Sequence, residues 1–423
     1  MSEAQIYDLE CILSALIAGA LVLTLLVPRL RRGRPRFRIG HAIAVAFGLR
    51  VLGALVVTAS PGAEQLRGGD EITFKANAAG LTGWDFFSTG TFKALTHQFH
   101  VFFFSLNDRV FSDVPDMMLR IEVITLAVAG LALIAAAVYE LAGARAATIT
   151  GWILALEPSN IFFSGILHKE PFMMLAEGLV AYGGAVLWKR GRLTALVPMV
   201  AGCLLATATR PYVGWFLAAG AAAVALHSAL RRRKSITSVA LAIAIVGLGI
   251  VFFPAVWNAS SSKNLQKLQT SQDANAADKS ANLSLERVDY SSRGKIIVNL
   301  PQRMIDIATR PYPWQVGNAS QQLGVLGTMF LVGALVLLIS ALMNNGRAIM
   351  QRAGPLIYPL LFLLVAYSLS AGNAGTAYRY RTHLVALLVG VICVLRASRS
   401  PQPTGVAAHR GRLQQMVPHA QRI

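Results

Sequence analysis

The sequence predicts an all-α, polytopic membrane protein with about eleven transmembrane helices and with interfacial helices in two long outer loops. The 423 residues are 55% hydrophobic and only 14% charged, whereas soluble domains are about 45–50% apolar and about 25% charged. The mean hydropathy is +0.53, and apolar runs long enough to cross a bilayer recur along the chain. This composition excludes a soluble enzyme, a nucleic-acid-binding module and a disordered protein.

Each expected span is an apolar run bounded by polar residues, since a transmembrane helix needs about 20 mostly apolar residues. The first run follows Glu3, Asp8 and Glu10 rather than basic residues, so we expect a membrane anchor and not a cleaved signal peptide. The expected spans cover residues 11–28, 39–60, 117–139, 146–166, 172–187, 194–207, 213–230, 236–256, 322–343, 355–369 and 383–395.

Basic residues are divided unevenly between alternate connectors. More than half of the 39 lysines and arginines lie in one set of connectors, which holds a single acidic residue, Glu140. Because lysine and arginine are enriched in cytoplasmic loops, we expect the N-terminus outside and the C-terminus inside the plasma (inner) membrane. The net charge of +19 then indicates topology and contact with lipid headgroups rather than nucleic acid. The lysines and arginines of this set lie at residues 29–38, 145, 189–192, 231–234, 347–352 and 396–423.

We therefore divide the chain into a transmembrane domain, residues 1–395, and a basic cytoplasmic tail, residues 396–423. The first outer loop, 61–116, carries aromatic residues spaced by three and four between Thr91 and Phe111, which predicts an interfacial helix with its aromatic face in lipid. The second outer loop, 257–321, is expected to be mobile or loosely helical at first and to end in a short interfacial helix. That helix is expected over residues 301–314, ended by prolines.

Four charged residues lie inside expected spans, where ionisable groups normally face a partner or a cavity. Arg50 and Glu157 lie at matching depth, about 16 Å from the inner ends of their spans, so they form a candidate buried pair. Glu122 and Glu177 lie nearer the outer face and are expected to line a site there.

The first outer loop also contains the candidate catalytic residues, Asp70 and Glu71. An acidic pair in a loop is ordinarily solvated. This pair lies just above the membrane and ahead of the expected interfacial helix, so a functional role is given the same weight as a solvated loop pair.

Short, polar outer turns supply the candidate substrate-binding residues. Arginine on this face runs against the usual topology rule, so the arginines need an anionic partner, which a lipid-linked phosphate would provide. Snorkelling arginines within an aromatic belt are the alternative interpretation. A lone histidine has no partner at metal-binding spacing, so no metal site and no cofactor is expected. The candidates are His168, Lys169, Glu170, Arg210, Tyr212, Tyr378, Arg379 and Arg381.

From about Gly69 to Leu395 these motifs resemble the GT-C class of membrane glycosyltransferases, which take sugars from polyprenyl phosphates. The class includes protein O-mannosyltransferases, aminoarabinose transferases and lipopolysaccharide-core transferases. The resemblance implies transfer of a sugar from a polyprenyl-phosphate donor to a glycan or lipid acceptor of the cell envelope, on the outer face. It assigns Asp70 as catalytic base, with Glu71 second, and an inverting path that needs a single base. The lipid phosphate would be held by Lys169, Arg210, Arg379 and Arg381.

Two other functions stay open. The Lys169-Glu170 turn also occurs in polysaccharide polymerases, which join lipid-linked oligosaccharides. A transporter or flippase for lipid-linked sugars is the third possibility, although transporters often contain repeated halves and this chain has no evident long repeat.

Overall fold

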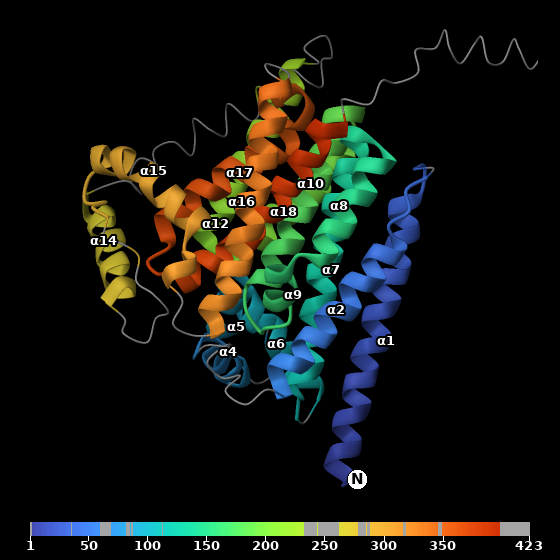
Figure 1. Ribbon diagram of the computed structural model, residues 1–423. Helices are drawn as coiled ribbons and strands as arrows, with labels where there is room; N and C mark the ends of the chain where they lie inside the picture. Colours follow the sequence, from blue (N-terminus) through green and yellow to red (C-terminus); the bar gives the residue numbers. More distant parts are fainter. Residues whose placement is uncertain are drawn as a thin grey trace, which may run out of the picture.

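The computed structural model is a bundle of helices (Figure 1), and every regular element that it describes is helical. It describes residues 2–34, 36–59, 69–81, 85, 88–111, 113–231, 243, 262–277, 285, 288–315, 319–345 and 349–397. The first half contains α1 (Glu3–Arg31), α2 (Gly40–Ala59), α4 (Gly69–Ala79), α5 (Thr89–His97), α6 (Phe99–Val110), α7 (Asp116–Ala142), α8 (Ala144–Leu156), α9 (Pro158–Ser164) and α10 (Glu170–Arg190). The second half contains η1 (Leu193–Ala195), α11 (Leu196–Thr209), α12 (Pro211–Arg231), α14 (Ser262–Ala277), α15 (Arg293–Thr309), η2 (Pro313–Gln315), α16 (Ala319–Asn345), α17 (Ile349–Ser370) and α18 (Ala374–Ala397).

Long apolar helices confirm the predicted fold class. Among the described residues, 8 helices are long and apolar enough to cross a membrane, namely α1, α2, α7, α10, α12, α16, α17 and α18. Two shorter apolar helices, α8 and α11, occupy further expected spans. The expected span over residues 236–256 lies outside the described residues, apart from Ile243.

Helices α7, α10 and α18 form the centre of the bundle. The apolar window of α7 is 89% buried, compared with 22% for α1, whose apolar side chains face outward as they would toward lipid. Helices α7 and α10 approach closely at Gly130 and Gly178, where a Cβ on Gly178 would lie 2.5 Å from the Gly130 oxygen. Small residues permit such close approach between membrane helices. This contact fixes the position of α10, which begins at Glu170, directly after the polar turn that carries His168.

The expected span over residues 146–166 is broken into α8 and α9. Pro158 occupies the first turn of α9, and the Glu157 carboxylate accepts hydrogen bonds from the backbone N–H of Ser159 (3.1 Å) and Asn160 (2.6 Å). A carboxylate that caps a helix N-terminus satisfies backbone donors that no carbonyl can reach. Glu157 is therefore a helix cap.

This role explains why the expected ion pair between Arg50 and Glu157 is not formed. Arg50 is fully buried and donates to backbone carbonyls of Ala46 (3.0 Å) and Leu154 (3.0 Å) and to the Ser164 hydroxyl (3.3 Å). Backbone carbonyls of α2 and of the last turn of α8 accept from the guanidinium in place of the Glu157 carboxylate.

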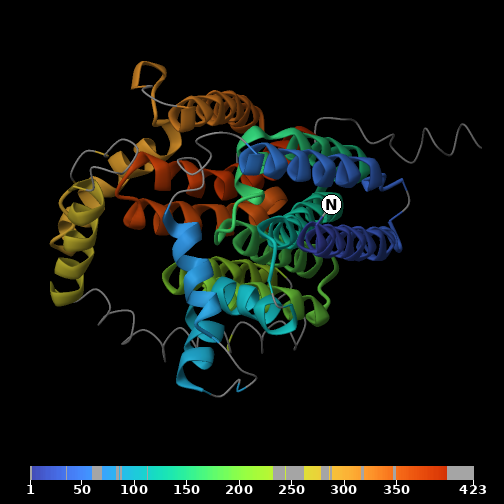
Figure 2. The same ribbon diagram turned by 90° about the horizontal axis from the view of Figure 1, so that it is seen from below.

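The first outer loop folds into α4, α5 and α6, which lie across one end of the bundle when it is viewed from below (Figure 2). The prediction that an aromatic face of this loop lies in lipid is wrong. The rings of Phe99, Phe103 and Phe104 pack edge-on against Phe172 of α10, with centroids 5.3–6.2 Å apart. Aromatic edge contacts with α10 hold α6 against the bundle.

The second outer loop supplies α14 and α15. Helix α15 begins at Arg293, eight residues before the expected start, because the Ser292 hydroxyl caps it by accepting from the Lys295 N–H (3.3 Å). Pro301 therefore lies inside the helix. Exposed Ile297, Val298 and Ile305 give α15 an outward apolar face, as expected of an interfacial helix.

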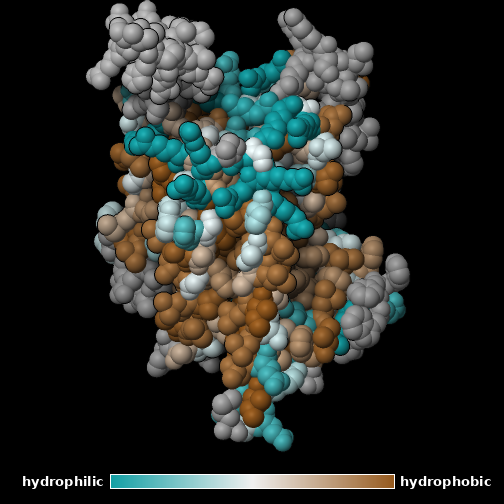
Figure 3. Space-filling model, turned by 90° about the vertical axis from the view of Figure 1, so that its right-hand side faces the viewer, coloured by the Kyte–Doolittle hydropathy of each residue, from teal (hydrophilic) through white to brown (hydrophobic). Residues whose placement is uncertain are grey.

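Arginine-rich connectors meet at the opposite end of the bundle. Arg34, from the connector between α1 and α2, and Arg190, from the last turn of α10, both pair with Glu140 in the last turn of α7. In Figure 3, which faces α1, hydrophilic side chains gather above an apolar surface. Helix α7 starts beside α4, where Lys75 pairs with Asp116. At 1.5 Å per residue, α7 separates the two ends by roughly 36 Å, enough to cross a bilayer.

Candidate functional site

The two neighbouring acids of the first turn of α4 have different surroundings. Glu71 is 3% exposed, pairs with the guanidinium of buried Arg120 from α7, and accepts the Leu167 N–H at 3.3 Å. The side chain of Asp70 is 53% exposed. Successive helical residues point about 100° apart, so one acid faces the bundle and the other faces outward. Glu71 is thereby committed to holding α4 against α7, and Asp70 is the accessible carboxylate.

A tight turn between α9 and α10 presents His168, Lys169 and Glu170. Arg120 donates to the Gly165 carbonyl at 2.8 Å and the His168 N–H donates to the Ile166 carbonyl at 2.8 Å. The same arginine therefore fixes both the turn and, through Glu71, the start of α4. His168 is buried, and Lys169 is half-buried.

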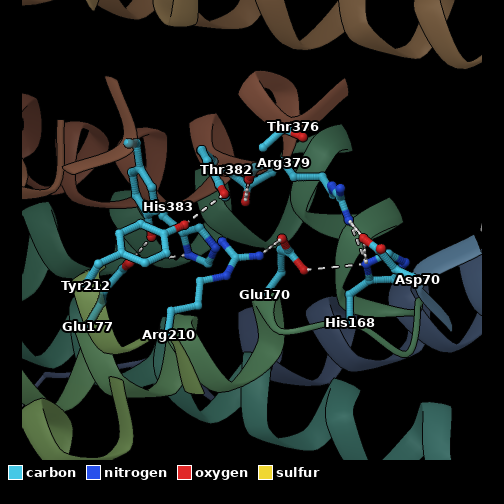
Figure 4. A network of polar contacts seen from close by, with 12 residues as sticks. Asp70, His168, Glu170, Glu177, Arg210, Tyr212, Thr376, Arg379, Thr382 and His383 are labelled. Carbon is cyan, nitrogen blue, oxygen red and sulfur yellow. Dashed lines mark hydrogen bonds and ion pairs between the residues drawn. The ribbon is translucent and has the colours of Figure 1, made fainter. Parts of the chain in front are cut away.

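Arg379 joins this turn to Asp70. Its Nη1 donates to Asp70 Oδ2 at 2.9 Å and to His168 Nδ1 at 2.8 Å (Figure 4). Helix α18 begins at Ala374, about nine residues before the expected span, so Arg379 projects from its second turn. Burial raises the pKa of Asp70, but the charge and hydrogen bond of Arg379 lower it by more, and the pKa stays below the usual aspartate value. Asp70 is therefore ionised at neutral pH.

Glu170 and Arg210 form a second, buried pair beside the first. Arg210 Nη2 donates to Glu170 Oε1 at 2.7 Å, and both side chains are less than a tenth exposed. The Arg210 guanidinium lies over the Tyr380 ring at 4.8 Å, and the Tyr380 hydroxyl is 3.0 Å from that of Tyr212. Glu170 Oε2 and Arg210 Nη1 are buried and have no hydrogen-bond partner among the residues that the structure describes. This pair has one free acceptor and one free donor.

Lys169 differs from Arg210 and Arg379, because its ammonium group is not paired with a carboxylate of any described residue. No carboxylate oxygen of the described residues lies within 4.0 Å of its Nζ, which sits 5.2 Å from the centre of the Phe74 ring. Burial, and after it the Arg210 guanidinium, lower the pKa of Lys169 below its usual value. A half-buried ammonium of this kind is suited to bind an anion from outside.

Two predicted binding residues lie elsewhere. Arg381 is 2% exposed and donates to Thr328 Oγ1 of α16 at 2.6 Å and to the Ala308 carbonyl of α15 at 3.4 Å. Tyr378 packs beside it, with its ring 5.1 Å from the guanidinium. Residues two apart on a helix point about 200° apart, so Arg381 faces the interior while Arg379 faces Asp70. Arg381 therefore ties α15 and α16 to α18 and does not join the site.

Sequence reasoning missed several polar residues near the site. His100 of α6 is fully buried edge-on to Phe74 at 4.4 Å, and burial lowers its pKa to about 2. Its sequence neighbours are mostly phenylalanines, so the local sequence gives no sign of a functional role. Only its position beneath the site in the structure draws attention to it. Arg120 carried a usable signal, because an arginine just inside an apolar span needs a buried acid.

A deeper pair lies on the same helices. His383 of α18 and Glu177 of α10 are both fully buried, with Nδ1 3.4 Å from Oε1, and the Tyr367 hydroxyl donates to Glu177 at 3.3 Å. Figure 4 shows this pair beyond Arg210 on the far side from Asp70. Glu122, the other glutamate expected near the outer face, instead accepts from Asn107 of α6 at 2.9 Å.

Comparison with known proteins gives no relative from which to transfer a function. No family model matches the chain, and no curated protein and no solved structure matches it.

Proposed function

We propose that the chain is a membrane-embedded glycosyltransferase that moves a sugar from a polyprenyl-phosphate donor to a hydroxyl of a cell-envelope acceptor. The proposal rests on one observation: a half-exposed, ionised carboxylate, Asp70, lies beside a cluster of cations at one end of a helical bundle. Sugar transfer needs a base for the acceptor proton and positive charge for the departing phosphate. The site offers both within one set of contacts.

Asp70 is the base in this proposal, and it acts alone. It is the accessible acid, whereas Glu71 is occupied by Arg120 and the Leu167 N–H. Glu71 is a positioning residue, because it joins the start of α4 to the turn that carries the cations. One base is what a single inverting displacement requires.

Lys169, Arg210 and Arg379 hold the donor phosphate in this proposal. These three cations face two carboxylates, Asp70 and Glu170, in the same cluster. The excess positive charge, together with the free Nη1 of Arg210, suits an oxygen-rich anion.

The charge distribution supports an outer-face site. The arginine-rich connectors meet at the end of the bundle opposite the cluster (Figure 1). If those connectors are cytoplasmic, the N-terminus is outside, the C-terminus is inside, and the cluster faces outward from the plasma membrane.

The test is transfer by the purified full chain in lipid nanodiscs. Polyprenyl-monophosphate sugars carrying a labelled sugar are supplied with envelope lipids and glycans, and labelled product is separated by chromatography. Transfer from a monophosphate donor is expected. Activity only with oligosaccharides on a diphosphate would identify a polymerase instead, and no transfer from either donor would contradict the proposal.

A second candidate, transport of lipid-linked sugar, is favoured by the buried pair of Glu177 and His383 inside α10 and α18. Ionisable groups inside membrane helices mark proton relays in transporters. Movement of labelled lipid-linked sugar across sealed vesicles, without transfer to any acceptor, would favour this candidate.

A further inference from the structure

His168 occupies a position where its protonation depends on Arg379. A guanidinium only donates hydrogen bonds, so the 2.8 Å contact from Arg379 Nη1 requires Nδ1 of His168 to accept. In this state Nδ1 carries no proton, and the imidazole is neutral with its proton on Nε2.

Two carboxylates flank the same nitrogen without bonding to it. His168 Nδ1 is 4.0 Å from Asp70 Oδ2 and 4.0 Å from Glu170 Oε2. Glu170 Oε2 is buried, and no described residue donates a hydrogen bond to it. A buried carboxylate oxygen that accepts no hydrogen bond is costly in free energy. This oxygen is therefore ready to accept a hydrogen bond from Nδ1 once that nitrogen is protonated.

Charged groups from the elements packed on the turn surround His168. Arg120 of α7 bonds the turn itself and pairs with Glu71 of α4, and Arg210, directly before α12, pairs with Glu170. Asp70 comes from α4, Glu170 from α10 and Arg379 from α18, Lys169 is the next residue, and His100 of α6 lies across the Phe74 ring. A bound phosphate would add negative charge here and compete for the Arg379 N–H groups. Both effects favour an imidazolium.

We propose that His168 is a proton-linked phosphate sensor: when a phosphate ester engages Arg379, Nδ1 takes up and keeps one proton from solvent, and its new N–H donates a hydrogen bond to a flanking carboxylate. The Arg379–Nδ1 hydrogen bond is lost, the new N–H bond forms, and Nε2 keeps its proton. The imidazolium adds a positive charge beside the phosphate. This inference rests on the proposed function, because it requires a phosphate at this site.

Proton uptake is measurable on the wild-type full chain. Titration calorimetry with a short-chain prenyl monophosphate, in buffers of different ionisation enthalpy at pH about 7.5, counts protons per ligand bound. That pH lies about one unit above the ordinary histidine pKa of about 6.5 and above the second phosphate pKa of about 6. Uptake approaching one proton is expected, and affinity should fall by up to about tenfold per pH unit as the pH rises.

The His168→Gln variant should bind prenyl monophosphate with little proton uptake, and its affinity should hardly change with pH. Any uptake that remains in this variant measures the proton taken by the phosphate itself. His97→Gln, at an exposed histidine of α5 whose Nδ1 lies 2.7 Å from the Thr96 hydroxyl, is the matched control and should behave as wild type. Binding by wild type without uptake, or unchanged uptake in His168→Gln, would overturn the sensor and leave the proposed function standing.

Inorganic phosphate is the second probe. Equal affinity and equal uptake with inorganic phosphate would support the sensor but contradict recognition of a lipid-linked donor. Absence of binding by both probes would overturn the sensor and the proposed function together.

Discussion

The two ends of the bundle both bring arginines to carboxylates, but they differ in what they leave unbonded. At the basic end, Glu140 accepts from Arg34 and from Arg190 through both of its oxygens, and Arg34 also donates to the Tyr182 hydroxyl at 2.9 Å. At the other end Glu170 Oε2 and Arg210 Nη1 are buried, and neither has a hydrogen-bond partner in the described part of the chain.

The difference separates a cluster that holds the fold from one that is open to a ligand. A fully bonded buried cluster gains nothing from a new partner, whereas buried polar atoms without partners are stabilised when one arrives. The cluster around Glu170 also keeps one carboxylate, Asp70, half-exposed. Substitutions at the basic end should therefore change stability, and those at the end that carries Asp70 should change binding and turnover.

The largest effect is expected for Asp70→Asn. Asparagine keeps the volume and most hydrogen bonding but cannot take the acceptor proton, so turnover should fall about 10²- to 10⁴-fold. Stability should hardly change, because the Arg379 pair is half-exposed. Transfer and donor affinity are measured on the same reconstituted protein, with Glu71→Gln compared in parallel. Full activity of Asp70→Asn would remove this residue from catalysis.

Next in size is Glu140→Gln, which leaves buried Arg34 without its counter-charge. Loss of one partner from a buried pair should lower the free energy of unfolding by about 3 kcal/mol. The measurement is denaturant unfolding in detergent, with transfer per folded molecule unchanged. Asp289→Asn, in the exposed pair with Lys295, is the control and should alter stability little. Equal stability of the two variants would contradict the distinction between the ends.

A smaller effect is expected when the phosphate loses one cation. Arg379→Ala should weaken prenyl-phosphate binding by about 1.5–3 kcal/mol, the value of a charge-assisted hydrogen bond, and Arg379→Lys should recover part of it. Arg381→Ala sharpens the contrast, because the buried Arg381 should affect stability and not affinity. A weakened affinity in Arg381→Ala, with an unchanged fold, would restore it to the binding site.

The smallest expected effect is a loss of folding stability at low pH. The pKa of Asp70 is lower in the folded chain than the usual value, so its pair with Arg379 stabilises the fold above about pH 4. That contribution is lost as the pH falls through the folded-state pKa. Because the carboxylate is half-exposed, the loss should be at most about 1 kcal/mol. Unfolding curves of wild type and Asp70→Asn should converge below pH 4, and a constant difference would contradict the pairing.

Sequence determined the membrane-spanning plan and the end at which polar residues gather. Apolar runs indicate which helices cross a bilayer, because apolar side chains leave water equally well against lipid and against another helix. The candidates Asp70, His168, Lys169, Glu170, Arg210 and Arg379 lie together as the outer-turn argument predicted. Glu157 at the helix break was misassigned, since capping and ion pairing use the same carboxylate.

Tertiary structure decided which of two neighbouring residues serves each role. Asp70 and Glu71 are adjacent in the sequence, and only the packing of α4 on Arg120 buries one of them and exposes the other. Arg379 and Arg381 are similarly equivalent in the sequence until α18 packs against α16. Polarity is a property of each side chain by itself, whereas the direction in which it points depends on how its helix is rotated against the others.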